Sequence, residues 1–129
     1  MARILLIEDQ EHQRQLYQEE LTDEGYEVLT AATGTEGLEL YLRHRPDLVV
    51  VDMLLPGMNG IEIMESLLSA NPQLPIIVHS AYSSPSHDFI TWFARAYVVK
   101  SGDLCELKQQ IQMALAGVET PSQTGVVPA

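Results

Sequence analysis

The sequence is poor in cysteine, in basic residues and in long hydrophobic runs. Its single cysteine, Cys105, excludes an internal disulfide bond, and we expect it to be a half-buried small apolar residue. Only 7 lysines and arginines stand against 18 aspartates and glutamates, which gives a formal net charge of −11. This balance argues against a nucleic-acid-binding surface. It leaves two interpretations open, an acidic surface that keeps the protein soluble or one that favours a basic partner.

No apolar run in the chain is long enough to cross a membrane. The apolar residues 4–7 are also too few for the core of a signal peptide, and the acidic Glu8 and Asp9 follow them at once. We therefore expect a cytoplasmic protein without membrane contact.

Short apolar runs alternate five times with segments of helical periodicity. Strands are expected at residues 3–7, 26–31, 48–51, 76–79 and 96–99. Helices are expected at residues 11–24, 34–44, 60–70, 85–93 and 104–116, with Thr33 and Asp103 as N-caps. In the first of them, the apolar Leu16, Tyr17 and Leu21 recur at helical spacing. The alternation predicts an α/β fold, a parallel sheet with helices on both faces. One domain would span residues 1–118, and residues 119–129 lack periodicity and indicate a flexible tail or the start of a linker.

Polar residues follow four of the expected strands, and the carboxyl ends of parallel strands gather at one edge of a sheet. Asp52 comes directly after the apolar run 48–51. An ionised carboxylate at the end of a buried strand requires partners. The ends of three other strands offer an acid pair, a hydroxyl and an ammonium: Glu8 with Asp9, Ser80, and Lys100. We interpret Asp52 as a residue that accepts a phosphoryl group.

Together these motifs resemble the receiver domain of bacterial response regulators, over residues 3–117. The resemblance rests on Asp47, Asp52, the Pro/Gly turn at residues 56–60 and the residues at the other strand ends: Glu8-Asp9, Ser80-Ala81, Tyr97 and Lys100. It implies a flavodoxin-like receiver fold, a five-stranded parallel sheet of order 2-1-3-4-5 with five helices. It also implies a stand-alone protein similar to chemotaxis regulators, or instead the excised receiver of a larger regulator with an output domain.

The resemblance assigns a role to each of these residues. Asp52 would take a phosphoryl group from a sensor histidine kinase or a histidine phosphotransfer protein. Lys100 would neutralise charge on the phosphoryl oxygens, and the Ser80 hydroxyl would donate a hydrogen bond to one of them. The cofactor would be Mg²⁺, with Mn²⁺ as a substitute, held by Glu8, Asp9, Asp52 and the backbone carbonyl of Leu54.

A conformational switch is implied as well. Ser80 would move towards the phosphoryl group and Tyr97 would rotate inward, which changes the face of the fourth helix, fifth strand and fifth helix for a downstream protein partner. Leu54 and Tyr82 occupy positions that tune the lifetime of the phosphoryl group, and neither offers an acid or an amide to orient water, so slow self-hydrolysis is expected. The protein would be no enzyme beyond its own phosphorylation and dephosphorylation, and either a monomer or a phosphorylation-dependent homodimer.

Two departures from the family pattern stand out. Ser101 follows Lys100 where the family usually has proline, so we expect a trans peptide bond there, a changed loop and a looser Lys100. The fourth helix is unusually aromatic. Phe89, Trp92 and Arg95 would form a partner or dimer surface, or the helix has an ordinary core face with one exposed ring.

Two other functions fit the same fold less well. A flavin-binding electron carrier would need small residues and free amides in the first turn, where this chain has Glu8 and Asp9. A Mg²⁺-dependent phosphohydrolase would need a second acid beside Asp52, and Met53 and Leu54 supply none. We interpret His79, which precedes Ser80, as a packed core histidine and not as a phosphodonor or ligand.

Overall fold

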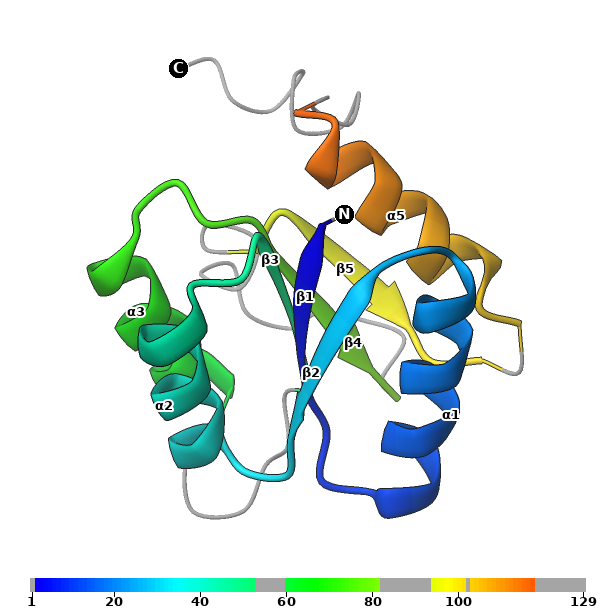
Figure 1. The fold of residues 1–129 in the computed structure, drawn as a ribbon, viewed down its shortest axis with the longest axis horizontal. Helices are drawn as coiled ribbons and strands as arrows, with labels where there is room; N and C mark the ends of the chain where they lie inside the picture. The colour runs from blue at the N-terminus through cyan, green and yellow to red at the C-terminus, as the bar shows by residue number, and fades with distance from the viewer. Residues whose placement is uncertain (1, 53–59, 82–93, 102, 118–129) are drawn as a thin grey trace.

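A computed structural model of the chain describes residues 2–52, 60–81, 94–101 and 103–117 (Figure 1). Five strands form one sheet: β1 (Arg3–Ile7), β2 (Glu27–Ala31), β3 (Leu48–Val51), β4 (Ile76–Ser80) and β5 (Ala96–Val99). All neighbouring strands are parallel, and their order is β2-β1-β3-β4-β5. The strand order that the resemblance implies is therefore confirmed.

Helices cover both faces of this sheet. The described part of the chain contains α1 (Glu11–Asp23), α2 (Gly34–His44), α3 (Gly60–Ala70) and α5 (Cys105–Leu115). The helix expected at residues 85–93 lies outside the described residues. Figure 1 places α1 and α5 on one face and α2 and α3 on the other. None of the described helices combines the length and the apolar character needed to cross a membrane.

The sheet separates two hydrophobic cores. Alternate residues of β1 face opposite sides, Leu5 and Ile7 towards α2 and α3, and Ile4 and Leu6 towards α1 and α5. The central strand β3 is buried along its whole length. Continuous burial is typical of a parallel strand that helices cover on both faces. The residue that follows β3 is thus held at the centre of the sheet edge.

Local sequence signals fix the ends of α1 and α2. Thr33 Oγ1 accepts a hydrogen bond from the backbone N–H of Glu36 at 3.1 Å, and Glu36 Oε1 accepts one from the backbone N–H of Ala32 at 2.8 Å. This is the predicted capping arrangement, except that the carboxylate reaches Ala32 and not Thr33 itself. Gly25 follows α1 with a φ of 98°, a conformation that glycine adopts without strain.

Three details differ from the sequence prediction. Leu16 is 48% exposed, because α1 is rotated so that Tyr17 and Leu21 face the sheet. The N-cap of α5 is Leu104 and not Asp103. Asp103 lies one residue before the N-cap, and its Oδ1 accepts a hydrogen bond at 2.9 Å from the backbone N–H of Cys105, the first residue of the helix. Cys105 is exposed and not half-buried, since the buried face of α5 begins only at Leu107.

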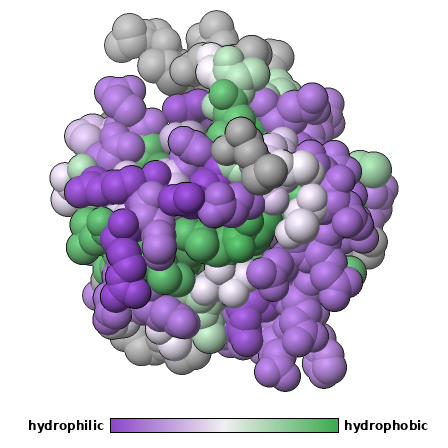
Figure 2. All heavy atoms as spheres, in the orientation of Figure 1, coloured by the Kyte–Doolittle hydropathy of each residue, from purple (hydrophilic) through white to green (hydrophobic). Residues whose placement is uncertain are grey.

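Polar and apolar residues are distributed unevenly over the molecular surface. Figure 2 shows mostly hydrophilic residues on the visible face, interrupted by a hydrophobic area near its centre. The acidic excess of the sequence is therefore carried on the outside of the fold, as the buried carboxylates of the described residues are few: Glu8 and Asp52.

Candidate functional site

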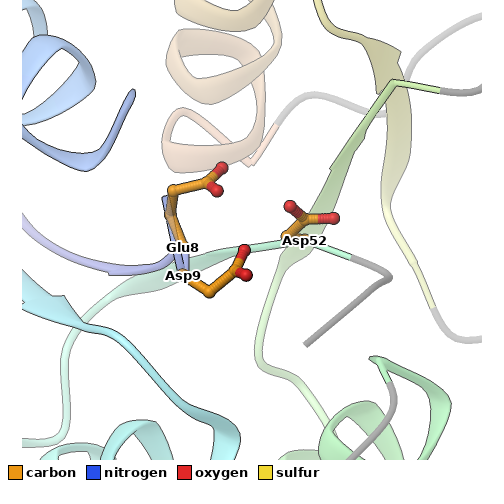
Figure 3. Close-up of side chains that lie close together, drawn as sticks. All are labelled: Glu8, Asp9 and Asp52. Carbon is orange, nitrogen blue, oxygen red and sulfur yellow. The ribbon is translucent and has the colours of Figure 1, made fainter. Parts of the chain in front are cut away.

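Two acidic residues are buried directly after the ends of strands, at the carboxyl edge of the sheet. Glu8 follows β1 and Asp52 follows β3, with exposed fractions of 2% and 8%. Asp9, the next residue after Glu8, is partly exposed. One carboxylate oxygen from each of these three residues lies within 4.8 Å of the other two, and Figure 3 shows the Asp9 and Asp52 groups turned towards a common space.

Such a cluster of carboxylates fits a hard divalent cation. Mg²⁺ prefers oxygen ligands and retains several waters, so one or two carboxylates at an open edge suit it. The donor set contains only oxygen atoms, and Asp9 keeps the cluster accessible from solvent. A cation here would also offset the repulsion among three negative charges at such short distances.

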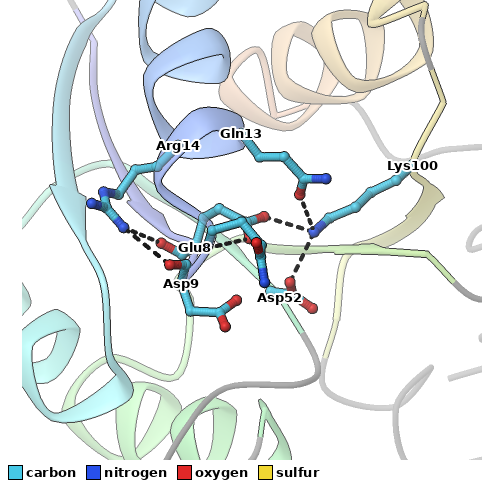
Figure 4. Close-up of polar contacts among 7 residues, drawn as sticks. Glu8, Asp9, Gln13, Arg14, Asp52 and Lys100 are labelled. Carbon is cyan, nitrogen blue, oxygen red and sulfur yellow. Dashed lines mark hydrogen bonds and ion pairs between the residues drawn. The ribbon is translucent and has the colours of Figure 1, made fainter.

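Lys100, which follows β5, reaches into the same cluster (Figure 4). Its Nζ donates to Glu8 Oε1 at 2.7 Å, to Asp52 Oδ2 at 2.8 Å and to Gln13 Oε1 at 2.9 Å. An ammonium has three protons, and each has an acceptor. The side chain of Lys100 is 12% exposed, so these contacts are shielded from solvent.

The expected loosening of Lys100 by Ser101 is wrong. The bond between them is trans, as predicted, since no cis peptide bond occurs among the described residues. The backbone N–H of Lys100 donates to the carbonyl of Ser80 at 2.6 Å, which continues the pairing of β4 and β5 past its last strand residue. The base of the lysine side chain is therefore fixed by the sheet, whichever residue follows it.

Burial and hydrogen bonding shift the pKa values of Glu8 and Lys100 in opposite directions. Burial raises the pKa of Glu8 above its usual value, although the hydrogen bond from Lys100 lowers it in part. Burial alone would lower the pKa of Lys100, but the hydrogen bonds to Asp52 and Glu8 outweigh it, and the net pKa is raised. Lys100 is consequently a cation at neutral pH, and a suitable neighbour for further negative charge.

The turn from β1 into α1 is held by Arg14 and Gln10. Arg14 Nη1 donates to the backbone carbonyls of Glu8 at 2.9 Å and Asp9 at 3.4 Å, and the Gln10 backbone N–H donates to Glu8 Oε2 at 3.1 Å (Figure 4). The sequence did not predict Gln13 or Arg14 as members of the site. The one sequence feature that could have indicated them is their position in the first helical turn after the acid pair.

The predicted switch residues lie close to this edge in the structure. Ser80 is the last residue of β4 and is 1% exposed. Tyr97 lies opposite Val78 in the β4–β5 pairing and packs, partly buried, against the core under α2 and α3. The structure thus places Ser80 at the carboxyl edge of the sheet and Tyr97 two residues before the end of β5.

Most residues predicted to tune lifetime or bind partners lie outside the described residues: Leu54, Tyr82, Phe89 and Trp92. Arg95 is described and half-buried, and its backbone N–H donates to the carbonyl of Ile76 at 2.6 Å. It lines a groove with Asp47 and Pro75 at the amino ends of the strands. Arg95 is therefore at the opposite end of β5 from the acid cluster.

His79 lies in the core between the sheet and α1, as expected. It is 2% exposed, its ring centroid is 4.9 Å from that of Tyr17, and its Nδ1 has no hydrogen-bond partner among the described residues. Burial, with a smaller effect of Lys100, lowers the pKa of His79 to about 4. The imidazole is therefore neutral near pH 7.

This burial predicts acid sensitivity of the fold. As the pH falls below 6.5, the unfolded chain binds a proton at His79 before the folded chain does, so stability is lost down to the folded-state pKa of about 4. Between pH 7 and pH 5 the free energy of unfolding should fall by about 2 kcal/mol more in the wild type than in His79→Leu. Urea denaturation of both proteins in EDTA measures this difference, in which shared carboxylate contributions cancel. Parallel pH dependences would refute it.

A parallel 2-1-3-4-5 sheet with an aspartate, an acid pair and a lysine at the ends of β3, β1 and β5 defines a receiver-type phosphorylation domain. The sequence profile of the response regulator receiver domain matches residues 4–112, and the chain belongs to this family. The resemblance inferred from the motifs is thereby confirmed.

Individual relatives agree with this assignment. Sporulation initiation phosphotransferase F of Bacillus subtilis is 39% identical over 80 residues, which are 62% of this chain and 64% of the relative. Response regulator TrrA of Thermotoga maritima, whose crystal structure was solved in complex with Mg²⁺ and BeF, has 38% sequence identity to this chain. The two structures superpose with a TM-score of 0.83 over 89% of this chain and 99% of TrrA. A structure of histidine kinase ThkA in complex with TrrA matches with a TM-score of 0.82, 38% identity and coverage of 89% and 98%. This chain spans less than two thirds of the length of the first curated relatives.

Proposed function

We propose that this chain is a phosphoacceptor of a two-component or phosphorelay pathway, which takes a phosphoryl group from a phosphohistidine onto Asp52. The observation that carries the proposal is the position of Asp52 Oδ2, 2.8 Å from the Lys100 ammonium and in one cluster with Glu8 and Asp9. The complexes of the similar regulator TrrA with Mg²⁺ and BeF and with histidine kinase ThkA support both a cation and a kinase partner.

Phosphoryl transfer exchanges one bond for another. The P–N bond of the phosphohistidine breaks, its electron pair stays on the imidazole, and a carboxylate oxygen of Asp52 forms the new O–P bond. Glu8, Asp9 and Asp52 would hold Mg²⁺, with the backbone carbonyl of Leu54 as the further predicted ligand. When bound, Mg²⁺ supplies positive charge between two anions that otherwise repel each other.

Lys100 and Ser80 are the chain's own groups for the incoming charge. The ammonium already donates to an oxygen of Asp52, so it lies beside the place where the phosphoryl oxygens arrive. It would transfer that hydrogen bond to a phosphoryl oxygen and neutralise part of its charge. The Ser80 hydroxyl at the end of β4 would donate to another phosphoryl oxygen.

The signal would leave through a changed protein surface. Ser80 moving to the phosphoryl group and Tyr97 turning inward would favour a second conformation of the face that includes β5 and α5. A downstream protein that binds this second conformation more tightly would detect the phosphorylation state. The chain would act as a monomer or as a phosphorylation-dependent homodimer. Residues 1–118 would form the receiver, and residues 119–129 a tail or linker.

Phosphorylation should be cation-dependent and persistent. Incubation with acetyl phosphate and Mg²⁺ should add one phosphoryl group to the intact mass, and EDTA should prevent the addition because the three carboxylates repel the donor. After removal of the donor, the adduct should persist beyond seconds, since Leu54 and Tyr82 offer no acid or amide to orient water. Intact-mass spectra over time measure both effects. No adduct at saturating Mg²⁺ would contradict the proposed function.

A further inference from the structure

Gln13 is the one uncharged acceptor among the three that the described residues give to Lys100. It lies in the first turn of α1, and its Oε1 is 2.9 Å from the Lys100 Nζ (Figure 4). Because the ammonium can only donate, the amide must turn its oxygen inward. The lysine is thus held from three elements, β1 through Glu8, β3 through Asp52 and α1 through Gln13.

The hydrogen bonds from Lys100 to its three acceptors would change differently during phosphoryl transfer. Asp52 changes from a carboxylate to an acyl phosphate, so its hydrogen bond with Lys100 has to pass to a phosphoryl oxygen. Glu8 belongs to the cation cluster, and a cation competes with the ammonium for its charge. Gln13 neither reacts nor belongs to that cluster, so its hydrogen bond persists through the reaction.

The absence of charge on Gln13 also favours the approach of a phosphoryl group. A carboxylate at this position would hold the ammonium equally well but would add negative charge where a phosphoryl group has to approach. An apolar side chain would leave one proton of a largely buried ammonium without its acceptor. An amide fixes the direction of the lysine without neutralising it.

We propose that Gln13 is a positioning residue for phosphoryl transfer, which holds one proton of the Lys100 ammonium and thereby aims another at Asp52 and then at the phosphoryl oxygen. The inference rests on the proposed function and deepens it. Gln13 acts through Lys100 and touches neither the phosphoryl group nor the cation.

The test compares Gln13→Met, which keeps the length of the side chain, with Gln15→Met as a matched control. Gln15 lies on the same helix and is exposed. With acetyl phosphate at saturating Mg²⁺, the initial rate of phosphorylation should fall about tenfold in Gln13→Met, the effect of losing one hydrogen bond to a charged group. The rate in Gln15→Met should equal that of the wild type.

Two further measurements separate positioning from a merely structural role. The Mg²⁺ concentration that gives half of the maximal rate should be unchanged in Gln13→Met, because the residue is not in the cation cluster. A slowly exchanging NMR signal of the Lys100 ammonium is expected in the wild type, because all three of its protons have acceptors. This signal should be lost in Gln13→Met and retained in Gln13→Glu, which restores the acceptor.

The possible failures are distinguishable. Equal rates in Gln13→Met and wild type, or a deficit that disappears as Mg²⁺ is raised, would overturn this inference and leave the proposed function intact. A wild type and a Gln15→Met variant that both take up no phosphoryl group would overturn the proposed function, and the role of Gln13 with it.

Discussion

Replacing Asp52 with asparagine is expected to abolish phosphoryl incorporation. The side chain keeps its size and an oxygen that accepts from Lys100, so the site is preserved around it. The amide oxygen, however, carries no full negative charge and cannot form a stable acyl phosphate. Intact mass after incubation with acetyl phosphate and Mg²⁺ should show one phosphoryl group on the wild type and none on Asp52→Asn.

Asp47→Asn provides the matched control for this experiment. Asp47 precedes β3 at its other end, where its Oδ2 accepts a hydrogen bond from the backbone N–H of Arg3 at 2.8 Å. The same substitution there should leave phosphorylation at the wild-type level. An adduct on Asp52→Asn would show that another carboxylate accepts the group, and Asp9, the more exposed neighbour, would be the first to examine.

Replacing Lys100 with methionine should destabilise the fold by about 3 kcal/mol at neutral pH without divalent cations. The variant removes the ammonium from two buried carboxylates, Glu8 and Asp52, which are 2% and 10% exposed at their side chains. The loss combines poorer solvation with repulsion between the two acids. Urea denaturation in EDTA gives the free energy of unfolding for both proteins.

Two conditions should reduce this loss. Lowering the pH favours proton binding to Glu8. Burial already raises the folded-state pKa of this carboxyl, and the loss of Lys100 raises it further, so stability is regained as the carboxylate is neutralised. Adding Mg²⁺ should stabilise Lys100→Met more than wild type, because a cation bound to the folded state replaces the missing positive charge.

Lys108→Met is the control for the loss of a lysine salt bridge. Lys108 Nζ lies 2.7 Å from Glu20 Oε1 between α5 and α1, but the side chains are 26% and 39% exposed. Surface pairs of this kind contribute little to stability, because solvent screens them. Comparable losses in the two variants, or no effect of Mg²⁺ on Lys100→Met, would refute a buried charge cluster at the sheet edge.

The strands and the positions of Asp52 and Lys100 were accessible from the sequence for a simple reason, whereas the order of the strands came from the family resemblance. Apolar runs bounded by proline, glycine and charge mark the strands, and parallel topology brings their carboxyl ends to one edge. Residues directly after those runs have little freedom in where they lie. Glu8 and Asp9 follow the same rule at the end of β1.

Gln13 and Leu16 were not accessible in this way. Their orientation depends on the rotation of α1 about its axis, which packing of Tyr17 and Leu21 decides. The hydrophobic periodicity of α1 is weak, so the sequence did not separate the buried face from the neighbouring residues. The firm hold on Lys100 was missed because it comes from the backbone pairing with Ser80 and not from the residue at position 101.

The hydrogen bonds of Lys100 join residues that are 92, 87 and 48 positions apart along the chain. During synthesis on the ribosome, the first acid pair emerges long before the lysine that completes the site. Contacts between such distant residues form only when the intervening loops have closed. A nascent or truncated chain that lacks β5 therefore has no assembled acceptor site. Under the proposed function, a chain can therefore receive a phosphoryl group only after its last strand has joined the sheet.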